Sequence, residues 1–155
     1  MAKIYLGTDH AGFELKEKVK NYLKEKGWPV DDQGAFEVDP NDDYTDYIKI
    51  VAKMVQGDDG SRGIIFGKSG QGEAICANRF QGVRAVVYYG GRPEILKLTR
   101  EHNDANVLSL GVHFIDFEEA KQAIDLWLAT MFSNDERHLR RIREIDDISN
   151  LGRII

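Results

Sequence analysis

The chain has 155 residues, and its 21 lysine and arginine residues against 26 aspartate and glutamate residues give a formal net charge of −5. This length suits one domain, and 42% hydrophobic with 30% charged residues suits a globular protein rather than a disordered or fibrous one. The net acidic charge excludes a general attraction to nucleic acid or to anionic lipid, so any anion binding must depend on a local basic group.

The first half of the chain predicts alternating strands and helices. Lys3 to Leu6 is strand-like, and a polar turn over 7–12 follows it. Apolar side chains then recur at helical spacing. A weak strand over 28–30 leads through an acidic loop, 39–43, into a helix over about 44–56.

The second half repeats this alternation. Buried-type strands are predicted at 63–66, 84–89 and 107–110, with a glycine-rich turn and a short helix after the first of them. A helix is predicted over about 93–102, and another begins at a capping-box pattern of Asp116 and Glu119 and has Met131 on its inner face. Ser133 and Glu136 repeat the capping pattern before a last helix that runs to about Ile145.

This alternation predicts an α/β fold, in which a five-stranded parallel sheet lies between two helical layers in a three-layer, Rossmann-like arrangement. No repeat or linker divides the chain, so we expect one domain over 1–155. No apolar run is long enough to span a membrane and the start of the chain has no signal-peptide core, so we expect a soluble, cytoplasmic protein. In such sheets, ligands bind beyond the carboxyl ends of the strands.

The segment from Gly67 to Glu73, Gly-Lys-Ser-Gly-Gln-Gly-Glu, follows one of these strand ends and is the most informative motif. Its glycines let the backbone approach a ligand closely, and the helix start that follows offers unpaired N–H groups, so the segment predicts an anion-binding loop. It is not a Walker A loop, because Arg62 stands where that motif needs a glycine. It is not the dinucleotide fingerprint either, because Ile75 stands at the third glycine position.

Side chains of this glycine loop have a structural and a chemical interpretation. Glu73 complements the helix dipole, or it is a general base beside N–H groups that stabilise an enediolate. Ser69 is a turn residue or part of that donor array, and Lys68 is an exposed cation, the interpretation we favour, or a further anion contact. The single cysteine, Cys76, excludes an internal disulfide and is best interpreted as a small core residue.

Polar residues elsewhere are candidates for the same site. Asp9 and His10 follow the first strand, where they either cap a helix or share a site with the glycine loop. His102 complements a helix C-terminus or shuttles protons. A metal site of Asp9, His10, His102 and Asp104 is a weak alternative, because no histidine pair has a recognised ligand spacing.

A basic segment over 137–143 is the local exception to the acidic composition. Arg137 and Arg141 are four residues apart and share a helix face, so their guanidinium groups can converge on one phosphate. The alternative is a solvated face on which they pair with neighbouring glutamates.

Together these motifs resemble the ribose-5-phosphate isomerase B type of sugar-phosphate isomerases, a family that includes galactose-6-phosphate isomerases. The matching segments occur in the family's order over nearly the whole chain, at 7–16, 43–44, 67–79, 100–106 and 137–141. The resemblance implies a metal-independent aldose–ketose isomerisation without a cofactor. It also implies a homodimer, or a tetramer built from it, whose active sites take residues from both subunits. The last helix and tail, about 134–155, would pack on the domain or on the partner subunit.

The resemblance also implies roles for single residues. One branch of the family uses as its base a cysteine that ends the third strand, where this chain has Gly67; a second branch uses the glutamate of a Ser-Gly-x-Gly-Glu pattern, which Ser69 to Glu73 match. The implied catalytic residues are Glu73 as the base, Ser69 in an oxyanion pocket, His102 of the partner subunit in ring opening, and Asp9. The implied substrate-binding residues are His10, Tyr44, Gly67, Lys68, Gly70, Gln71, Gly72, Asn103, His113, Arg137 and Arg141.

Two departures from the family pattern leave the identity of the sugar open. His113 stands where the family usually has a phosphate-binding arginine, and Lys68 replaces a small residue at the mouth of the glycine loop. We expect ribose 5-phosphate and ribulose 5-phosphate, and the alternatives are allose 6-phosphate, galactose 6-phosphate or a tetrulose 4-phosphate. A non-catalytic sugar-phosphate binding protein is the remaining alternative, although a mere binder has no need of both Glu73 and His102.

Overall fold

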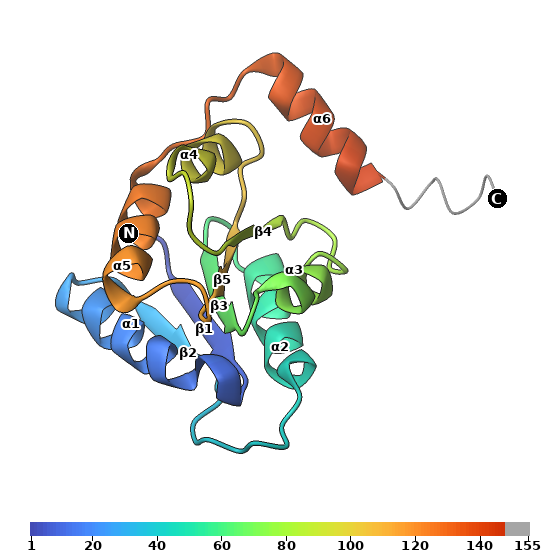
Figure 1. Cartoon of the computed structure of the whole chain (residues 1–155). Helices are drawn as coiled ribbons and strands as arrows, with labels where there is room; N and C mark the ends of the chain where they lie inside the picture. Colours follow the sequence, from blue (N-terminus) through green and yellow to red (C-terminus); the bar gives the residue numbers. More distant parts are fainter. Residues whose placement is uncertain (148–155) are drawn as a thin grey trace.

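A five-stranded parallel sheet organises residues 1–147, the part of the chain that the computed structural model describes (Figure 1). Every strand pairs in parallel with its neighbours, in the order β2-β1-β3-β5-β4. The strands are β1 (Ile4–Thr8), β2 (Val30–Asp32), β3 (Arg62–Gly67), β4 (Ala85–Tyr88) and β5 (Val107–Gly111).

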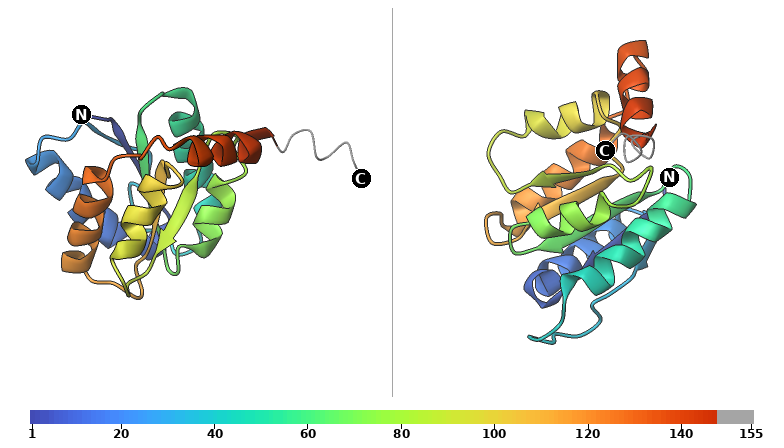
Figure 2. Two further views of the ribbon diagram at one scale, coloured as in Figure 1. Left: turned by 90° about the horizontal axis from the view of Figure 1, so that it is seen from above. Right: turned by 90° about the vertical axis from the view of Figure 1, so that its right-hand side faces the viewer.

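Helices cover both faces of this sheet, as Figure 2 shows. One face carries α1 (Phe13–Glu25), α4 (Glu94–Glu101) and α5 (Phe117–Ala129), and the other carries α2 (Tyr44–Gly57) and α3 (Gln71–Ala77). A short 3-10 helix, η1 (His10–Gly12), joins β1 to α1. The prediction of a three-layer α/β/α fold with a five-stranded parallel sheet is therefore confirmed.

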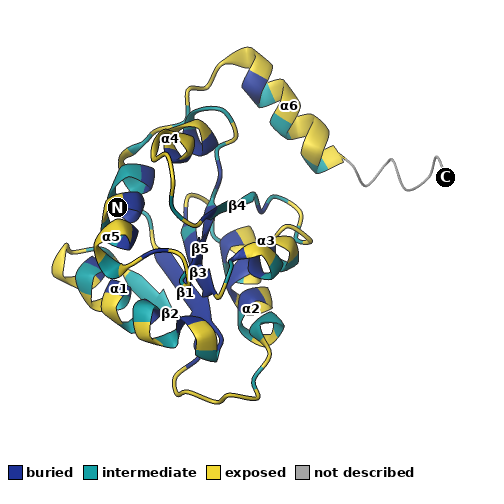
Figure 3. Cartoon of the chain, in the orientation of Figure 1, coloured by how far each residue is buried: buried dark blue, intermediate teal, exposed yellow. Residues whose placement is uncertain are grey.

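The central strands are buried (Figure 3), and alternation of side chains along them divides the core between the two helical layers. Ile64 and Phe66 of β3 pack under α1 and α5, whereas Ile65 between them packs under α2 and α3. Because both faces are covered, the central strands are apolar runs rather than alternating ones. Among the helices of residues 1–147, none is both long and apolar enough to cross a membrane.

Two local predictions near the end of the chain need correction. The capping box at Asp116 and Glu119 is present, but Ser133 does not cap the last helix, α6 (Glu136–Asp146). Its hydroxyl accepts a hydrogen bond from the Asp135 backbone N–H, at 3.3 Å, in the turn before the helix. Met131 is 78% exposed rather than buried, because α5 ends at Ala129 and the chain then turns extended.

The helix α6 lies outside the three layers of the fold (Figure 1). His138 is its one buried residue within 136–147, and Asp146 accepts hydrogen bonds from the loop before β4. The expectation that about 134–155 packs on the domain or on a partner subunit stays a prediction, and residues 148–155 of it lie outside the described residues.

Candidate active site

The topology creates a crevice where the loops after β1 and β3 diverge. These strands are neighbours, but the chain leaves β1 toward α1 on one face and leaves β3 toward α3 on the other. The Thr8 hydroxyl at the end of β1 donates to the Phe66 carbonyl at the end of β3, at 2.9 Å. The prediction that the Asp9 turn neighbours the glycine loop is therefore confirmed.

The end of β5 holds the glycine loop in place. The Ser109 hydroxyl donates to the Gly70 carbonyl at 2.7 Å, and the Val112 N–H donates to the Gly67 carbonyl at 2.9 Å. Gly70 has a φ of 77°, a left-handed conformation that favours glycine. These hydrogen bonds fix the path of the loop between β3 and the first turn of α3.

Glu73 lies in this crevice, directly over Gly67. Its residue is 5% exposed, and a Cβ atom built on Gly67 would overlap its carboxyl group. Burial raises the pKa of Glu73, the nearby Asp9 carboxylate adds to the rise, and the backbone N–H of Glu73 opposes it only in part. Burial thus outweighs the helix terminus, a balance that the sequence left open.

Three further predicted residues lie in the glycine loop or beside it. The Tyr44 ring lies against Gly72, since a Cβ atom there would come within 2.7 Å of the phenol oxygen. Ser69 accepts a hydrogen bond from the Gln71 backbone N–H at 3.3 Å, which is the turn role, and it stays half-buried. Lys68 is exposed, as we favoured from the sequence.

Asp9 and His10 form the other wall of the crevice. Asp9 is 8% exposed and accepts from the Ala11 backbone N–H at 3.0 Å, so it does cap the short helix η1. His10 Nδ1 lies 2.6 Å from Asp42 Oδ1, and this bond raises the pKa of His10. Asp42 was not predicted from the sequence, where its only signal is its place beside the Asp43-Tyr44 motif.

The metal site weighed from the sequence does not form within one chain. Asp9 and His10 lie at the carboxyl edge of the sheet, whereas His102 and Asp104 precede β5 and lie at the amino edge. The Asp104 carboxylate is instead paired with Arg84 and Arg100, at 3.1 and 2.8 Å. Ligand atoms of Asp9, His10 and Asp42 do lie within 4.8 Å of one another, although two of these residues are directly bonded as an ion pair.

The remaining predicted residues gather at the amino edge of the sheet. The length of β5, roughly 15 Å at 3.3 Å per residue, separates this edge from Glu73. The His102 ring stacks on the buried His138 ring at 4.4 Å between centroids. The residues that stay exposed beside this stack are Asn103, Arg137 and Arg141.

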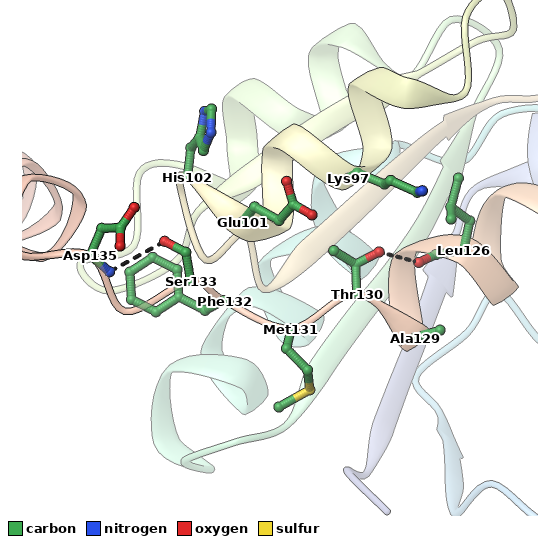
Figure 4. A pocket seen from close by; sticks show the side chains of 10 residues that line it. All are labelled: Lys97, Glu101, His102, Leu126, Ala129, Thr130, Met131, Phe132, Ser133 and Asp135. Carbon is green, nitrogen blue, oxygen red and sulfur yellow. Dashed lines mark hydrogen bonds between the residues drawn. The ribbon is translucent and has the colours of Figure 1, made fainter.

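A groove of about 690 Å³ lies at this amino edge, between α4 and the segment after α5 (Figure 4). Glu101 and Lys97 line one side, and Thr130 and Met131 line the other. The His102 side chain points away from Met131 in this view. The groove is therefore distant from Glu73, and the predicted site residues form two separate groups within one chain.

The two departures from the family pattern lie together at the carboxyl edge. The His113 backbone N–H donates to the Lys68 carbonyl at 3.1 Å, and its exposed ring meets Phe114 edge-on at 5.3 Å. Cys76 is half-buried against the core cluster beneath α2, and burial raises the pKa of its thiol. The environment of Cys76 is therefore that of a core residue rather than that of a nucleophile.

Comparison with known proteins gives a consistent result. Residues 4–145 match the family model for Ribose/Galactose Isomerase. The chain is 39% identical to ribose-5-phosphate isomerase B of Mycobacterium leprae (90% of this chain, 85% of that one) and 38% identical to that of Escherichia coli (96% and 97%). Similar solved structures include a ribose 5-phosphate isomerase of Thermotoga maritima (42% identity, TM-score 0.87, 94% and 98% coverage). Another is the Mycoplasma genitalium enzyme with bound ribulose 5-phosphate (34%, TM-score 0.90, 96% of both chains).

Proposed function

The chain belongs to the ribose/galactose isomerase family and is an isomerase, and from this premise we propose that it interconverts ribose 5-phosphate and ribulose 5-phosphate with Glu73 as the base. The observation that carries the proposal is the position of the Glu73 carboxyl group over Gly67. In the cysteine branch of the family, a side chain at the end of the third strand supplies the base. In this chain, the Glu73 carboxyl group fills the space that a side chain at position 67 would occupy. The carboxylate can therefore act on the substrate from the place where the cysteine lies in that branch.

The reaction needs one group that takes and returns a proton. The Glu73 carboxylate takes the proton from the carbon next to the carbonyl, which leaves an enediolate, and returns it to the former carbonyl carbon, while the hydroxyl proton of the substrate moves to the former carbonyl oxygen. Burial raises the pKa of Glu73, which makes its carboxylate a stronger base than an exposed one. Backbone N–H groups of the glycine loop, with the Ser69 hydroxyl, stabilise the negative charge on the substrate oxygen.

A second copy of the chain completes the site in this proposal. Glu73 and Asp9 lie at one edge of the sheet, and His102 and Arg137 lie at the other, roughly 15 Å away along β5. A five-carbon sugar phosphate is too short to be held by both groups of one chain. In a homodimer, His102 of the partner subunit opens the sugar ring, its Asn103 positions a hydroxyl, and its Arg137 and Arg141 hold the phosphate with His10.

Another phosphorylated sugar is the second candidate substrate, favoured by His113 and Lys68 at the mouth of the loop. The deciding experiment compares kcat/KM for ribose 5-phosphate, allose 6-phosphate, galactose 6-phosphate and erythrulose 4-phosphate in deuterated solvent. We expect the highest kcat/KM with ribose 5-phosphate, and deuterium at the carbon that gains the proton. A higher value for another sugar would reassign the substrate, and tight binding without deuterium uptake by any sugar would indicate a binding protein.

The Gly67→Ala variant tests the position of the base. Its methyl group would overlap the Glu73 carboxyl group, so we expect that group to be displaced and kcat to fall by roughly 10² or more. Steady-state kinetics with ribose 5-phosphate measures the loss. Gly57→Ala is the matched control, because a Cβ atom there meets nothing within 4 Å. Wild-type kcat in the Gly67→Ala variant would contradict the assignment of Glu73.

A further inference from the structure

We propose that Asp42 is a positioning residue that fixes both the orientation and the charge of His10. The inference rests on the proposed function, in which His10 binds the phosphate of the substrate. Nothing in the acidic loop over 39–43 marks this residue in the sequence, since three of its five positions are aspartate. Its role follows from contacts that the fold creates.

One carboxylate oxygen of Asp42 accepts two hydrogen bonds from the same histidine. The His10 backbone N–H donates to Oδ1 at 3.1 Å, and His10 Nδ1 lies 2.6 Å from the same atom. Together these bonds fix the His10 backbone and the plane of its ring. They also commit Nδ1, so Nε2 is the ring nitrogen that is left to donate to a ligand.

The Asp42 side chain is buried and the His10 side chain is partly exposed, as expected if Asp42 positions His10 and His10 binds the substrate. The Asp42 side chain is 7% exposed, whereas the His10 side chain is 38% exposed. Tyr47 of α2 also acts on this carboxylate and helps to lower its pKa. The carboxylate is therefore enclosed by protein, whereas the imidazole that it holds stays accessible to a ligand from solvent.

The charges around His10 favour its protonated form. Three carboxylates face it: Asp42 and Asp39 from the acidic loop, and Asp9 from the turn after β1, whose Oδ2 lies 4.0 Å from Nδ1. The hydrogen bond to Asp42 is the main cause of the raised pKa of His10 and exceeds the opposing effect of desolvation. Burial acts to raise the pKa of Asp42, but the two bonds from His10 hold it below its ordinary value.

This charge carries particular weight in this chain. The residue after β5 that is usually an arginine in the family is His113 here, and the ring of His113 is exposed. Position 113 therefore does not supply a permanently charged guanidinium to the phosphate. An imidazolium at position 10, held by Asp42, supplies a positive charge to the phosphate from that half.

The Asp42→Asn variant tests the proposal, because it removes the charge and keeps the shape. We expect KM for ribose 5-phosphate to rise by roughly 10-fold or more and kcat to change much less, since phosphate binding is lost and the base is untouched. We also expect the alkaline limb of kcat/KM to move to lower pH, because His10 then loses its proton sooner. Asp39→Asn is the matched control: it changes the same charge in the same loop, but Asp39 acts on His10 only through its charge.

Two further measurements separate this proposal from the function on which it rests. The Asp42→Asn, His10→Asn double variant should be no worse than His10→Asn alone, because both changes remove one interaction. An NMR titration of the His10 ring, without substrate, should give a pKa above the ordinary histidine value in the intact protein and a lower one in Asp42→Asn. An ordinary or low pKa in the wild-type protein, additive effects in the double variant, or equal kinetics for Asp42→Asn and Asp39→Asn would each overturn the proposal. If the wild-type protein turned over no sugar phosphate, the proposed function would fail, while the titration would still decide the role of Asp42.

Discussion

Replacing Glu73 by Gln is expected to lower kcat for ribose 5-phosphate isomerisation by about 10² to 10⁴, the usual contribution of a positioned general base. The amide has the shape of the carboxyl group but cannot take the proton that must move between neighbouring carbons. Cys76, a candidate nucleophile close to Glu73 in sequence, is packed against the core, and burial raises the pKa of its thiol. Steady-state kinetics and deuterium uptake from solvent both measure the loss.

The same variant provides its own control for folding. Burial raises the pKa of Glu73 in the folded protein. At a pH above this raised pKa, the ionised carboxylate lowers the free energy of unfolding. This loss of stability disappears as the pH falls below the pKa that Glu73 has in the unfolded chain. Glu73→Gln should therefore melt at the same temperature as the wild-type protein or higher at neutral pH, and this advantage should shrink in acid. Thermal melts across pH measure the difference.

Glu37→Gln is the matched control for the kinetics, because Glu37 is exposed in the loop before α2 and has no proposed role in proton transfer. It should have wild-type kcat. Turnover retained in Glu73→Gln, with the Glu37→Gln control intact, would show that another group is the base. A variant that lost both activity and thermal stability would point instead to a structural role for Glu73.

Mixing two inactive variants is expected to restore activity, which is the second large effect. In the proposed homodimer, Glu73→Gln and His102→Asn are each expected to inactivate every site of their own dimers. In a two-fold heterodimer of these variants, one site receives both substitutions and the other receives neither. After random subunit exchange at equal concentrations, about a quarter of the wild-type activity should return, because half of the dimers carry one intact site each.

The control mixture combines Glu73→Gln with Ser69→Ala, which alters the same half of the site. Every heterodimer then carries one substitution in each site, so no activity beyond the sum of the parents should appear. Native mass spectrometry confirms that subunits have exchanged in both mixtures. Exchange without recovery in the Glu73→Gln and His102→Asn mixture would show that Glu73 and His102 do not act in a shared site.

The local features of the fold could be predicted from the sequence because they depend on short-range patterns. The apolar runs that become β3 and β5 and the capping box at Asp116 are read within a few residues. The prediction that Ser133 caps the last helix was wrong, because short-range patterns do not decide between neighbouring N-cap residues. Asp135 is as good an N-cap residue as Ser133, and the place where α6 begins depends on how the preceding segment packs.

The importance of Asp42 could not be predicted, because a loop of aspartates has no periodicity to single one out. Only the folded loop brings one carboxylate to His10 and leaves Asp39 and Asp43 in solvent. The stack of His102 on His138 is equally invisible in the sequence, where the two residues are 36 positions apart. Such contacts depend on the whole path of the chain between the two residues.

The sequence by itself determined the kinds of groups available: a glutamate after a glycine loop, an aspartate and histidine after the first strand, and a local cluster of arginines in an acidic chain. The tertiary structure decided which of them meet. Parallel strands bring the ends of β1 and β3 together, so Asp9 joins Glu73, while the length of β5 keeps His102 and Arg137 at the opposite edge. The tertiary structure also decided the pKa of Glu73, because the balance between burial and a helix terminus depends on how much protein surrounds the carboxyl group.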